Sequence, residues 1–359
     1  MTHNPAMSPW WFSVAALAVL GANWTVVSML VEYAPRLGLL DRPNNRSMHT
    51  KVTPRGGGLG FVLVVMLVTA GCLLAGRIET ELRQPLIIYL VAACLMAAVG
   101  LWDDFRSLSP APRFLCQLAA AVAAVAGVAA YSSAAIPALG VIPLGWVGAA
   151  LTVLWIVGLT NVYNFMDGID GIAGVQGTVA GLAWMTIGIW TGSAAIAVLG
   201  LLLAMGCAAF LLFNWSPAKI FMGDVGSAFL GYSFAVLPLL LVRLRPGSGA
   251  EIIPWVGLLL VWPFVGDGFY TFVRRARRGE VVWKPHRSHL YQRLVQSGWT
   301  HASVSTLYAG WGLLSAGAGV CWYRGAAGAG LVLTAAAVML LPAVCLLVLR
   351  RERRKDSPA

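Results

Sequence analysis

Charge is scarce in this chain: Asp, Glu, Lys and Arg make up 11% of its 359 residues, against about a quarter in soluble domains. Hydrophobic residues make up 59%, and the mean hydropathy is +0.77. A chain with so few charges cannot cover the surface of an ordinary soluble domain. The composition therefore excludes that class and predicts a polytopic membrane protein.

Several common signatures are also missing. The six cysteines lie in apolar runs without CxxC spacing or neighbouring histidines, so we expect core residues and neither a disulfide framework nor a zinc site. No segment matches GxxxxGK[ST], so ATP hydrolysis of the P-loop type is not indicated. The stretch from Met1 to Pro9 lacks Lys and Arg, and no small-residue cleavage site follows it. We therefore expect the first span to be retained.

Eleven apolar runs reach the roughly 17 to 22 residues that a helix needs to cross a bilayer. They cover residues 10–31, 58–76, 85–101, 114–131, 145–160, 175–192, 194–213, 226–242, 252–272, 302–323 and 326–349. The predicted fold class is all-α and polytopic, with about 11 transmembrane helices. We expect one catalytic domain over residues 1–349 and a basic tail over residues 350–359.

The basic residues are divided unequally between the loops. If the spans alternate in direction, only five of the 25 Lys and Arg residues lie in the even-numbered loops: Arg77, Arg83, Arg243, Arg245 and Arg324. All others lie in the odd-numbered loops and the C-terminal segment, and such an excess marks the cytoplasmic side. We predict a cytoplasmic C-terminus and an N-terminus on the outer side of the membrane.

Each odd-numbered loop also carries a polar cluster. The clusters run from Asp41 to Gly58, Trp102 to Phe105, Asn161 to Gly171, Lys219 to Ser227 and His286 to Gln292. The even-numbered loops are mostly Gly, Pro, Ser and Ala. A single catalytic face requires this distribution, so we predict that the five loops converge into one active site on the cytoplasmic side.

The third cluster is the densest. Asn161, Asn164, Asp167 and Asp170 recur at every third position, and we expect them to share one face of a helix. Amides can donate to phosphate or pyrimidine carbonyls, and carboxylates can accept from sugar hydroxyls or uracil N–H. A polar contact between transmembrane helices is the alternative, although it normally requires one such residue. Four of them favour a binding role.

Three further carboxylates stand at span ends. Asp103 and Asp104 are adjacent, and a divalent cation or a basic neighbour would offset their repulsion; a solvated acidic turn is equally consistent. Asp224 lies among glycines at the start of a helix, where free N–H groups favour phosphate and an aspartate can hold Mg²⁺; a helix cap is the alternative. Asp267, inside the ninth span, has no partner that the sequence identifies.

Two of the odd-numbered loops are cationic. In the last one, Arg287 lies between His286 and His289, which favours anion recognition over metal binding. If both histidines must be cationic to hold a diphosphate, activity should fall as the pH rises above their pKa. The first loop interleaves basic residues with turn formers, as expected of a clamp on a phosphorylated substrate or of an exposed basic loop. These residues are Arg46, His49, Lys51 and Arg55.

Together the five motifs resemble those of the polyprenyl-phosphate N-acetylhexosamine-1-phosphate transferases, a superfamily of the glycosyltransferase family 4 type. The resemblance covers nearly the whole chain, from Asp41-Arg-Pro to the loop at His286. It implies transfer of a sugar 1-phosphate from a UDP-sugar to undecaprenyl phosphate, with release of UMP. It also implies Mg²⁺ as cofactor, with Mn²⁺ as a substitute.

The resemblance implies roles for individual residues. The catalytic carboxylates would be Asp103, Asp104 and Asp224, and the metal ligands would be Asp224 and Asn164. The nucleotide or sugar would contact Lys51, Asn161, Asn164, Asp167, Asp170 and Gly223. The diphosphate or sugar would contact Arg46, His49, Arg55, His286, Arg287 and His289.

The last loop also bears on the substrate. It reads His286-Arg-Ser-His289, where the peptidoglycan translocases carry three consecutive histidines. The chain therefore resembles the branch that initiates O-antigen synthesis, with UDP-GlcNAc or a 6-deoxy relative such as UDP-FucNAc as donor. The phospho-MurNAc-pentapeptide transferase and a secondary transporter are the alternatives. Expected partners are the UDP-sugar, undecaprenyl phosphate and the lipid bilayer, without nucleic acid; a homodimer is open.

Overall fold

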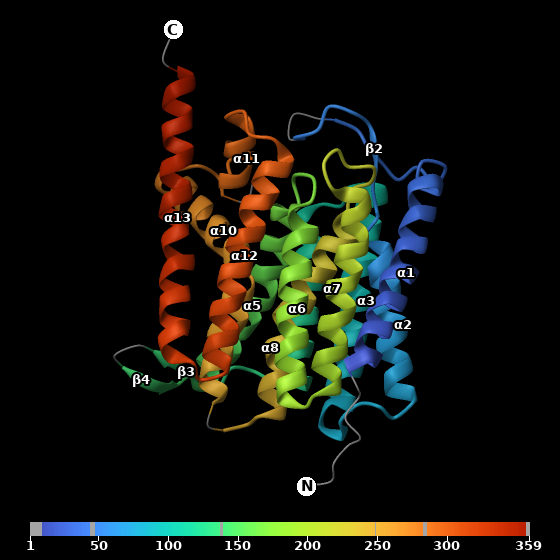
Figure 1. Cartoon of the computed structure of the whole chain (residues 1–359), viewed down its shortest axis with the longest axis vertical. Helices are drawn as coiled ribbons and strands as arrows, with labels where there is room; N and C mark the ends of the chain where they lie inside the picture. Colours follow the sequence, from blue (N-terminus) through green and yellow to red (C-terminus); the bar gives the residue numbers. More distant parts are fainter. Residues whose placement is uncertain (1–8, 44–46, 137–138, 248, 283–285, 357–359) are drawn as a thin grey trace.

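The computed structural model describes residues 9–43, 47–136, 139–247, 249–282 and 286–356, which form a helical bundle with two short hairpins (Figure 1). The helices are α1 Pro9–Tyr33, α2 Leu59–Leu74, α3 Thr80–Arg106, α4 Pro110–Gly127, α5 Gly145–Met166, α6 Ile172–Thr191, α7 Ala194–Asn214, α8 Asp224–Leu244, α9 Ile253–Leu260, α10 Trp262–Arg277, α11 Leu290–Gln296, α12 His301–Tyr323 and α13 Ala327–Asp356. The strands are β1 Leu40–Asp41, β2 Thr53–Pro54, β3 Ser133–Ile136 and β4 Gly140–Pro143, and a 3₁₀ turn, η1, covers Ala250–Ile252. The helical, polytopic character is confirmed.

Each predicted span corresponds to an apolar helix or helix pair, but fewer than eleven of these are long and apolar enough to cross a membrane. Within the described residues, nine helices are long and apolar enough to cross a membrane, and the bent pair α9–α10 would make a tenth span. At 16 residues, α2 rises only about 24 Å. The count of eleven and the orientation of the bundle therefore stay predictions.

The central helix of the bundle is α8. In the most apolar 18-residue stretch of α8, 94% of the residues are buried inside the protein. The corresponding share is 17% for α13, which lies at the periphery. α8 packs against α2, α3, α5 and α9, as expected of a helix that is apolar on all sides. Because α8 begins at Asp224, one end of the core carries that carboxylate.

A glycine brings α3 against the start of α8. A Cβ at Gly100 would overlap the backbone carbonyl of Asp224, so the two backbones can approach this closely only because Gly100 has no side chain. Asp103 and Asp104 follow one turn later on α3. The close approach therefore places both of them beside the N-terminus of α8.

The predicted ninth span is not a single helix. It is divided at Val261 into α9 and α10, whose axes differ by 77°. Pro263 lies in the first turn of α10, where its ring and its missing N–H prevent the preceding helix from continuing. Asp267 lies one turn after Pro263 on α10.

The two hairpins mark opposite ends of the bundle. Figure 1 shows the β1–β2 segment, α11 and the C-terminal end of α13 at one end, and the β3–β4 hairpin at the other. Trp255 ties the second hairpin to α9, because its Nε1 donates to the carbonyl oxygen of Ala135 at 2.6 Å. α13 continues as one helix through the predicted boundary at residue 349 to Asp356.

Candidate active site

The five predicted loops meet around a cavity of about 480 Å³, a volume within the range of about 300–1,000 Å³ that ligand pockets occupy. Its polar lining includes His49, Arg55, Asp104, Asp167, Asp170, Gly223, Asp224, Gln292 and His301. These residues come from all five loops, together with the first residue of α12. We call this space the large cavity.

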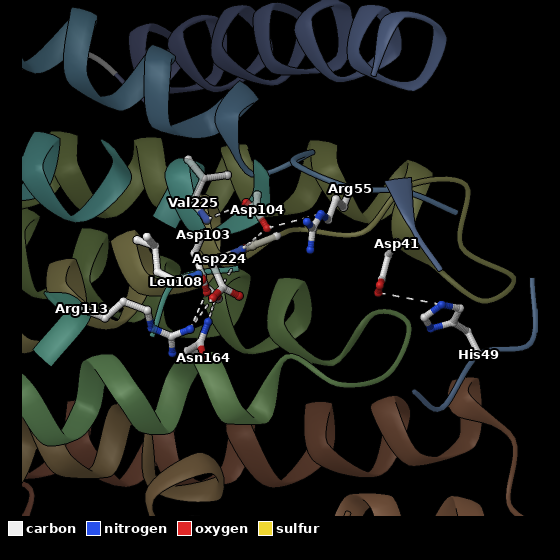
Figure 2. A network of polar contacts seen from close by, with 12 residues as sticks. Asp41, His49, Arg55, Asp103, Asp104, Leu108, Arg113, Asn164, Asp224 and Val225 are labelled. Atoms are coloured by element: carbon white, nitrogen blue, oxygen red, sulfur yellow. Dashed lines mark hydrogen bonds and ion pairs between the residues drawn. The ribbon is translucent and has the colours of Figure 1, made fainter. Parts of the chain in front are cut away.

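A second, smaller cavity of about 20 Å³, enough for one water, adjoins the carboxylates. Its polar lining consists of Asp103, Arg113, Gln117, Asn164 and Asp224, and apolar side chains of α3 and α8 complete it. Asp224 lines both cavities. Figure 2 shows the three carboxylates gathered between Arg113 and Asn164 on one side and Arg55 on the other.

Asp104 caps α8 from a different helix. Its Oδ1 accepts the backbone N–H of Asp224 at 3.0 Å, and its Oδ2 accepts that of Val225 at 3.1 Å. The first N–H groups of a helix have no partner within it, so an acceptor placed there stabilises the helix start. The backbone at Gly223 has φ +77°, and a side chain there would collide with the Asp104 carboxylate. Asp104 and Gly223 together therefore determine that α8 begins at Asp224.

Asp103 and Asp224 share a cation. Nη1 of Arg113 contacts Oδ2 of Asp103 and lies 3.2 Å from Oδ2 of Asp224. Carboxylates this close together repel one another, and a guanidinium between them offsets the repulsion. The sequence interpretation counted Arg113 only as a cytoplasmic basic residue. Its position in the first turn of the helix after the Asp103-Asp104 pair was the available signal.

The two asparagines of α5 occupy different surroundings. Asn164 lines the small cavity and donates to Oγ of Ser227 at 2.9 Å. Asn161 donates to Oε1 of Gln117 at 2.6 Å and to the carbonyl oxygen of Val157 at 2.8 Å. Among the described residues, Asn161 lines neither cavity. Its contact with Gln117 joins α5 to α4. This is the polar contact between transmembrane helices that the sequence left open as the alternative to a binding role.

The predicted helical stripe ends earlier than expected. α5 stops at Met166, and the backbone of Asp167 is no longer helical, with φ −85° and ψ 56°. The expectation that Asp167 and Asp170 continue the helical face of Asn164 is therefore wrong. Glycines on both sides of Asp170 explain the break, since they favour turns and Gly171 adopts φ +83°. The turn still directs both aspartates to the large cavity.

Asp167 and Asp170 differ in charge state. Burial raises the pKa of Asp167 to about 7, and the nearby charges of Asp104 and Asp170 add to the rise. Burial also opposes ionisation of Asp170, but hydrogen bonding and the charge of His301 hold its pKa below the ordinary value. Nδ1 of His301 lies 3.3 Å from Oδ1 of Asp170, and the N–H of Ala218 donates to Oδ2 at 3.2 Å. Sequence reasoning missed His301, for which no motif gave a signal.

The first loop reaches the large cavity only in part. His49 and Arg55 line it. Nε2 of His49 lies 3.8 Å from the carboxylate of Asp41, and Nε of Arg55 lies 3.9 Å from that of Asp104 (Figure 2). Lys51 is exposed and, among the described residues, does not line the large cavity. Arg46 lies outside the described residues.

Within the part of the chain that the structure describes, the last loop reaches the large cavity through Gln292, and His286, Arg287 and His289 do not line it. Arg287 is exposed, and Nη1 donates to the carbonyl oxygen of Ser47 at 3.4 Å. His289 is buried beside Asp267. Burial lowers the pKa of His286 to about 4, and the neighbouring His289 and Arg275 contribute. A pKa this low favours the neutral imidazole of His286 at pH 7 and does not support the hypothesis that this residue must be cationic to hold a diphosphate.

The donor set suits a hard cation. Asp224, Asn164 and Asp103 line one cavity, and their side chains carry the carboxylate and amide oxygens that Mg²⁺ prefers as ligands. No three Asp, Glu, His or Cys side chains are grouped as a metal site within the described part of the chain. Mg²⁺ at phosphoryl-transfer sites commonly takes one or two carboxylates and completes its shell with substrate phosphates and water. Asp224 and Asn164 are the residues that would hold it.

Fold and site together define a polytopic membrane protein with a carboxylate-rich cavity at one end of its helical bundle. Residues 86–242 match the model of "Glycosyl transferase family 4". The chain is 34% identical over 299 residues to the probable undecaprenyl-phosphate N-acetylglucosaminyl 1-phosphate transferase of Bacillus subtilis, covering 83% of this chain and 80% of that protein. The chain belongs to glycosyl transferase family 4.

Two further relatives help to separate branches within this family. The decaprenyl-phosphate N-acetylglucosaminephosphotransferase of Mycobacterium leprae is 30% identical over 381 residues, or 94% of this chain and 91% of that protein. The phospho-N-acetylmuramoyl-pentapeptide-transferase of Chlorobaculum tepidum is 41% identical, but over 58 residues and 16% of each chain. The similarity that extends over most of the chain is thus to the N-acetylglucosamine 1-phosphate transferases.

Proposed function

We propose that the protein transfers an N-acetylhexosamine 1-phosphate from a UDP-sugar to undecaprenyl phosphate at the cytoplasmic face of a bacterial inner membrane. An oxygen of the lipid phosphate forms a bond to the phosphorus that carries the sugar. The bond between that phosphorus and the bridging oxygen breaks, and UMP leaves with the bonding electrons. Such a transfer depends on positioning and charge neutralisation more than on covalent help from the protein.

One observation carries this proposal: Asp224 lines both cavities. The large cavity offers Asp167, Asp170 and the cations of the first loop to a nucleotide diphosphate. Beside the small cavity, which has room for one water, Arg113 lies next to apolar side chains of α3 and α8, so a lipid phosphate that binds near Arg113 would meet a cation and an apolar surface. Asp224 lies between the two, where a bound Mg²⁺, or Mn²⁺ as a substitute, would neutralise the transferred phosphoryl group.

The remaining side chains have roles that follow from their positions. Arg113 neutralises the carboxylates and the incoming lipid phosphate, and Asp104 holds the start of α8. Arg55 and His49 face the donor diphosphate, while Asp167 and Asp170 accept from the nucleotide. His289 is buried beside Asp267 and is outside the described lining of the large cavity, so its assignment to the diphosphate rests on the family resemblance and not on its position.

The donor is UDP-GlcNAc or a 6-deoxy relative such as UDP-FucNAc, and the product initiates O-antigen or another surface polysaccharide. The long matches to N-acetylglucosamine 1-phosphate transferases support an N-acetylhexosamine donor. The short match to a muramoyl-pentapeptide transferase gives less support to that alternative. Membership of a glycosyl transferase family argues against the secondary transporter.

The test is UMP release by the purified protein in detergent with undecaprenyl phosphate, Mg²⁺ and a panel of UDP-N-acetylhexosamines. We expect UMP only when lipid, metal and one of these donors are all present, and none from Asp224→Ala. Release that persists without the lipid would indicate hydrolysis instead of transfer. Donor binding that needs neither Mg²⁺ nor Asp224, without any UMP, would favour a transporter.

A further inference from the structure

Asp267 is a carboxylate inside the bundle that the proposed reaction does not use. Its side chain is completely buried on α10. A buried carboxylate is costly unless hydrogen bonds or a cation compensate it, and its two oxygens can accept about four hydrogen bonds. The surroundings of Asp267 therefore show what the protein gains from keeping it.

Four donors from three helices converge on this carboxylate. On α11, the N–H of Leu290 donates to Oδ1 at 2.8 Å and the N–H of Tyr291 donates to Oδ2 at 3.2 Å. On α12, the hydroxyl of Tyr308 donates to Oδ2 at 2.6 Å. On α10 itself, Thr271 donates to Oδ1 at 3.1 Å. Asp267 thus caps α11 from a neighbouring helix.

The fifth neighbour is an imidazole. Nδ1 of His289 lies 3.4 Å from Oδ1 of Asp267, which is an ion-pair distance, and this buried nitrogen makes no hydrogen bond among the described residues. The ring of His289 packs against two others, with its centroid 4.9 Å from that of His286 and 5.8 Å from that of Tyr291. Ring packing and the carboxylate together fix the orientation of this imidazole.

The capped helix continues to the large cavity. The hydroxyl of Tyr291 donates to the carbonyl oxygen of Phe165 at 2.9 Å, directly before the turn that carries Asp167. Gln292, the next residue, lines the large cavity. Asp267 therefore connects the break in the ninth span to the edge of the candidate active site.

We infer that Asp267 is a positioning residue for His289. Its carboxylate holds the imidazole with Nδ1 protonated and directed toward Asp267, which leaves Nε2, on the far side of the ring, for the diphosphate of the donor. A carboxylate that selects the tautomer of an imidazole in this way is a common device of catalytic sites. The use of Nε2 rests on the proposed function, whereas the state of Nδ1 does not.

The first test is nuclear magnetic resonance of the full-length protein in nanodiscs with ¹⁵N-labelled histidine. The chain contains five histidines, and the His289 signal is assigned from its loss in His289→Gln. We expect Nδ1 of His289 to be protonated in the native protein. An unprotonated Nδ1 together with a protonated Nε2 would overturn the inference, whatever the enzymatic activity.

Asp267→Asn extends the test. It keeps the size of the side chain but replaces an acceptor by an N–H₂ group, so we expect the Nδ1 signature to change. Glu352→Gln is the matched control, because Glu352 holds α11 through Arg293, with Nε to Oε1 at 2.8 Å. It should leave the His289 signal unchanged. If Asp267→Asn does not fold, Tyr308→Phe removes one donor from the carboxylate and should preserve the tautomer.

Kinetics then test whether the effect passes through His289. We expect Asp267→Asn to lower kcat at least about tenfold with a smaller change in KM for the donor. In a His289→Gln background the same substitution should add little, because residues that act through one another are non-additive. Additive losses would show that Asp267 only supports the fold. Full activity of His289→Gln would remove the role proposed for Nε2 and leave the tautomer assignment to the resonance experiment.

Discussion

Asp104 holds the helix that begins with Asp224. Its two carboxylate oxygens accept the N–H groups of Asp224 and Val225 at 3.0 and 3.1 Å. One member of the aspartate pair on α3 therefore sets the position of α8, and Asp103 contacts Arg113 instead. Two adjacent carboxylates of the same chemistry have different tasks because only Asp104 accepts the N–H groups at the start of α8.

Replacing Asp104 by Ala should therefore misplace Asp224. The two N–H groups lose their buried acceptor, which costs about 1–3 kcal/mol for each group left unpaired. A displacement of about 1 Å at a reacting group lowers the rate about 100-fold. We expect UMP release to fall by at least that factor.

The control for Asp104→Ala is Ser193→Ala. Ser193 caps α7 by accepting from the N–H of Ile196 at 3.3 Å and does not line either cavity among the described residues. Its loss should cost about 1 kcal/mol and lower the thermal unfolding midpoint without affecting UMP release. Equal activity losses in the two variants would reduce the role of Asp104 to general stability.

Arg113→Gln should affect the metal and the rate in opposite directions. Removing the guanidinium from Asp103 and Asp224 strengthens the attraction of these carboxylates for a cation, so the half-saturating Mg²⁺ concentration should fall about three- to tenfold. The lipid phosphate loses a neutralising charge, so kcat should fall at least about tenfold. A Mg²⁺ titration of UMP release measures both quantities.

Arg106→Gln is the comparison for Arg113→Gln, because it removes the same charge from the exposed end of α3. Arg106 lines neither cavity in the described part of the chain, so both quantities should stay nearly unchanged. A rise in the Mg²⁺ requirement of Arg113→Gln would show that Arg113 supports the metal site.

The sequence predicted the convergence of the five loops because each cluster follows directly from an apolar run. The helix that starts at Asp224 could also be predicted, because glycines and a carboxylate before an apolar segment are a local pattern. Pro263 was also a local signal for the break in the ninth span, although the apolar run over residues 252–272 was interpreted as one continuous span. These features depend on neighbours in the chain, which the sequence displays.

Contacts between distant residues could not be predicted in the same way. Arg113 meets Asp224, and His301 meets Asp170, only after the helices have packed. Asn161 looks like Asn164 in sequence, yet one turn along α5 separates an amide that contacts Gln117 from one that lines the small cavity. Helical spacing alone cannot decide which face of a span meets a neighbour.

Asp167 should make donor binding depend on pH. Its pKa of about 7 means that about nine tenths of the side chain is protonated at pH 6 and ionised at pH 8. If the carboxylate accepts a hydrogen bond from the nucleotide, affinity for the UDP-sugar should rise about tenfold over this range. Isothermal titration calorimetry without the lipid measures this directly.

Two variants separate Asp167 from its neighbours in that experiment. Asp167→Asn should weaken binding and remove the dependence on pH. Asp170→Asn should weaken binding but keep the dependence, because Asp170 has a lowered pKa and stays ionised throughout this range. A slope that survives in Asp167→Asn would assign the titration to another group.

His286 should make the fold sensitive to acid while leaving the activity profile unaffected. Its pKa is lowered to about 4 in the folded protein and is about 6.5 in an unfolded chain. The unfolded state therefore binds more protons between these values, and stability should fall as the pH drops from about 6.5 toward 4. His286→Gln should lessen this loss, measured as the thermal unfolding midpoint at pH 7.5 and pH 5. Between pH 6 and 9 its profile of UMP release should keep the native shape. A native decline in rate near pH 7 that disappears in His286→Gln would show that this histidine acts as a cation after all.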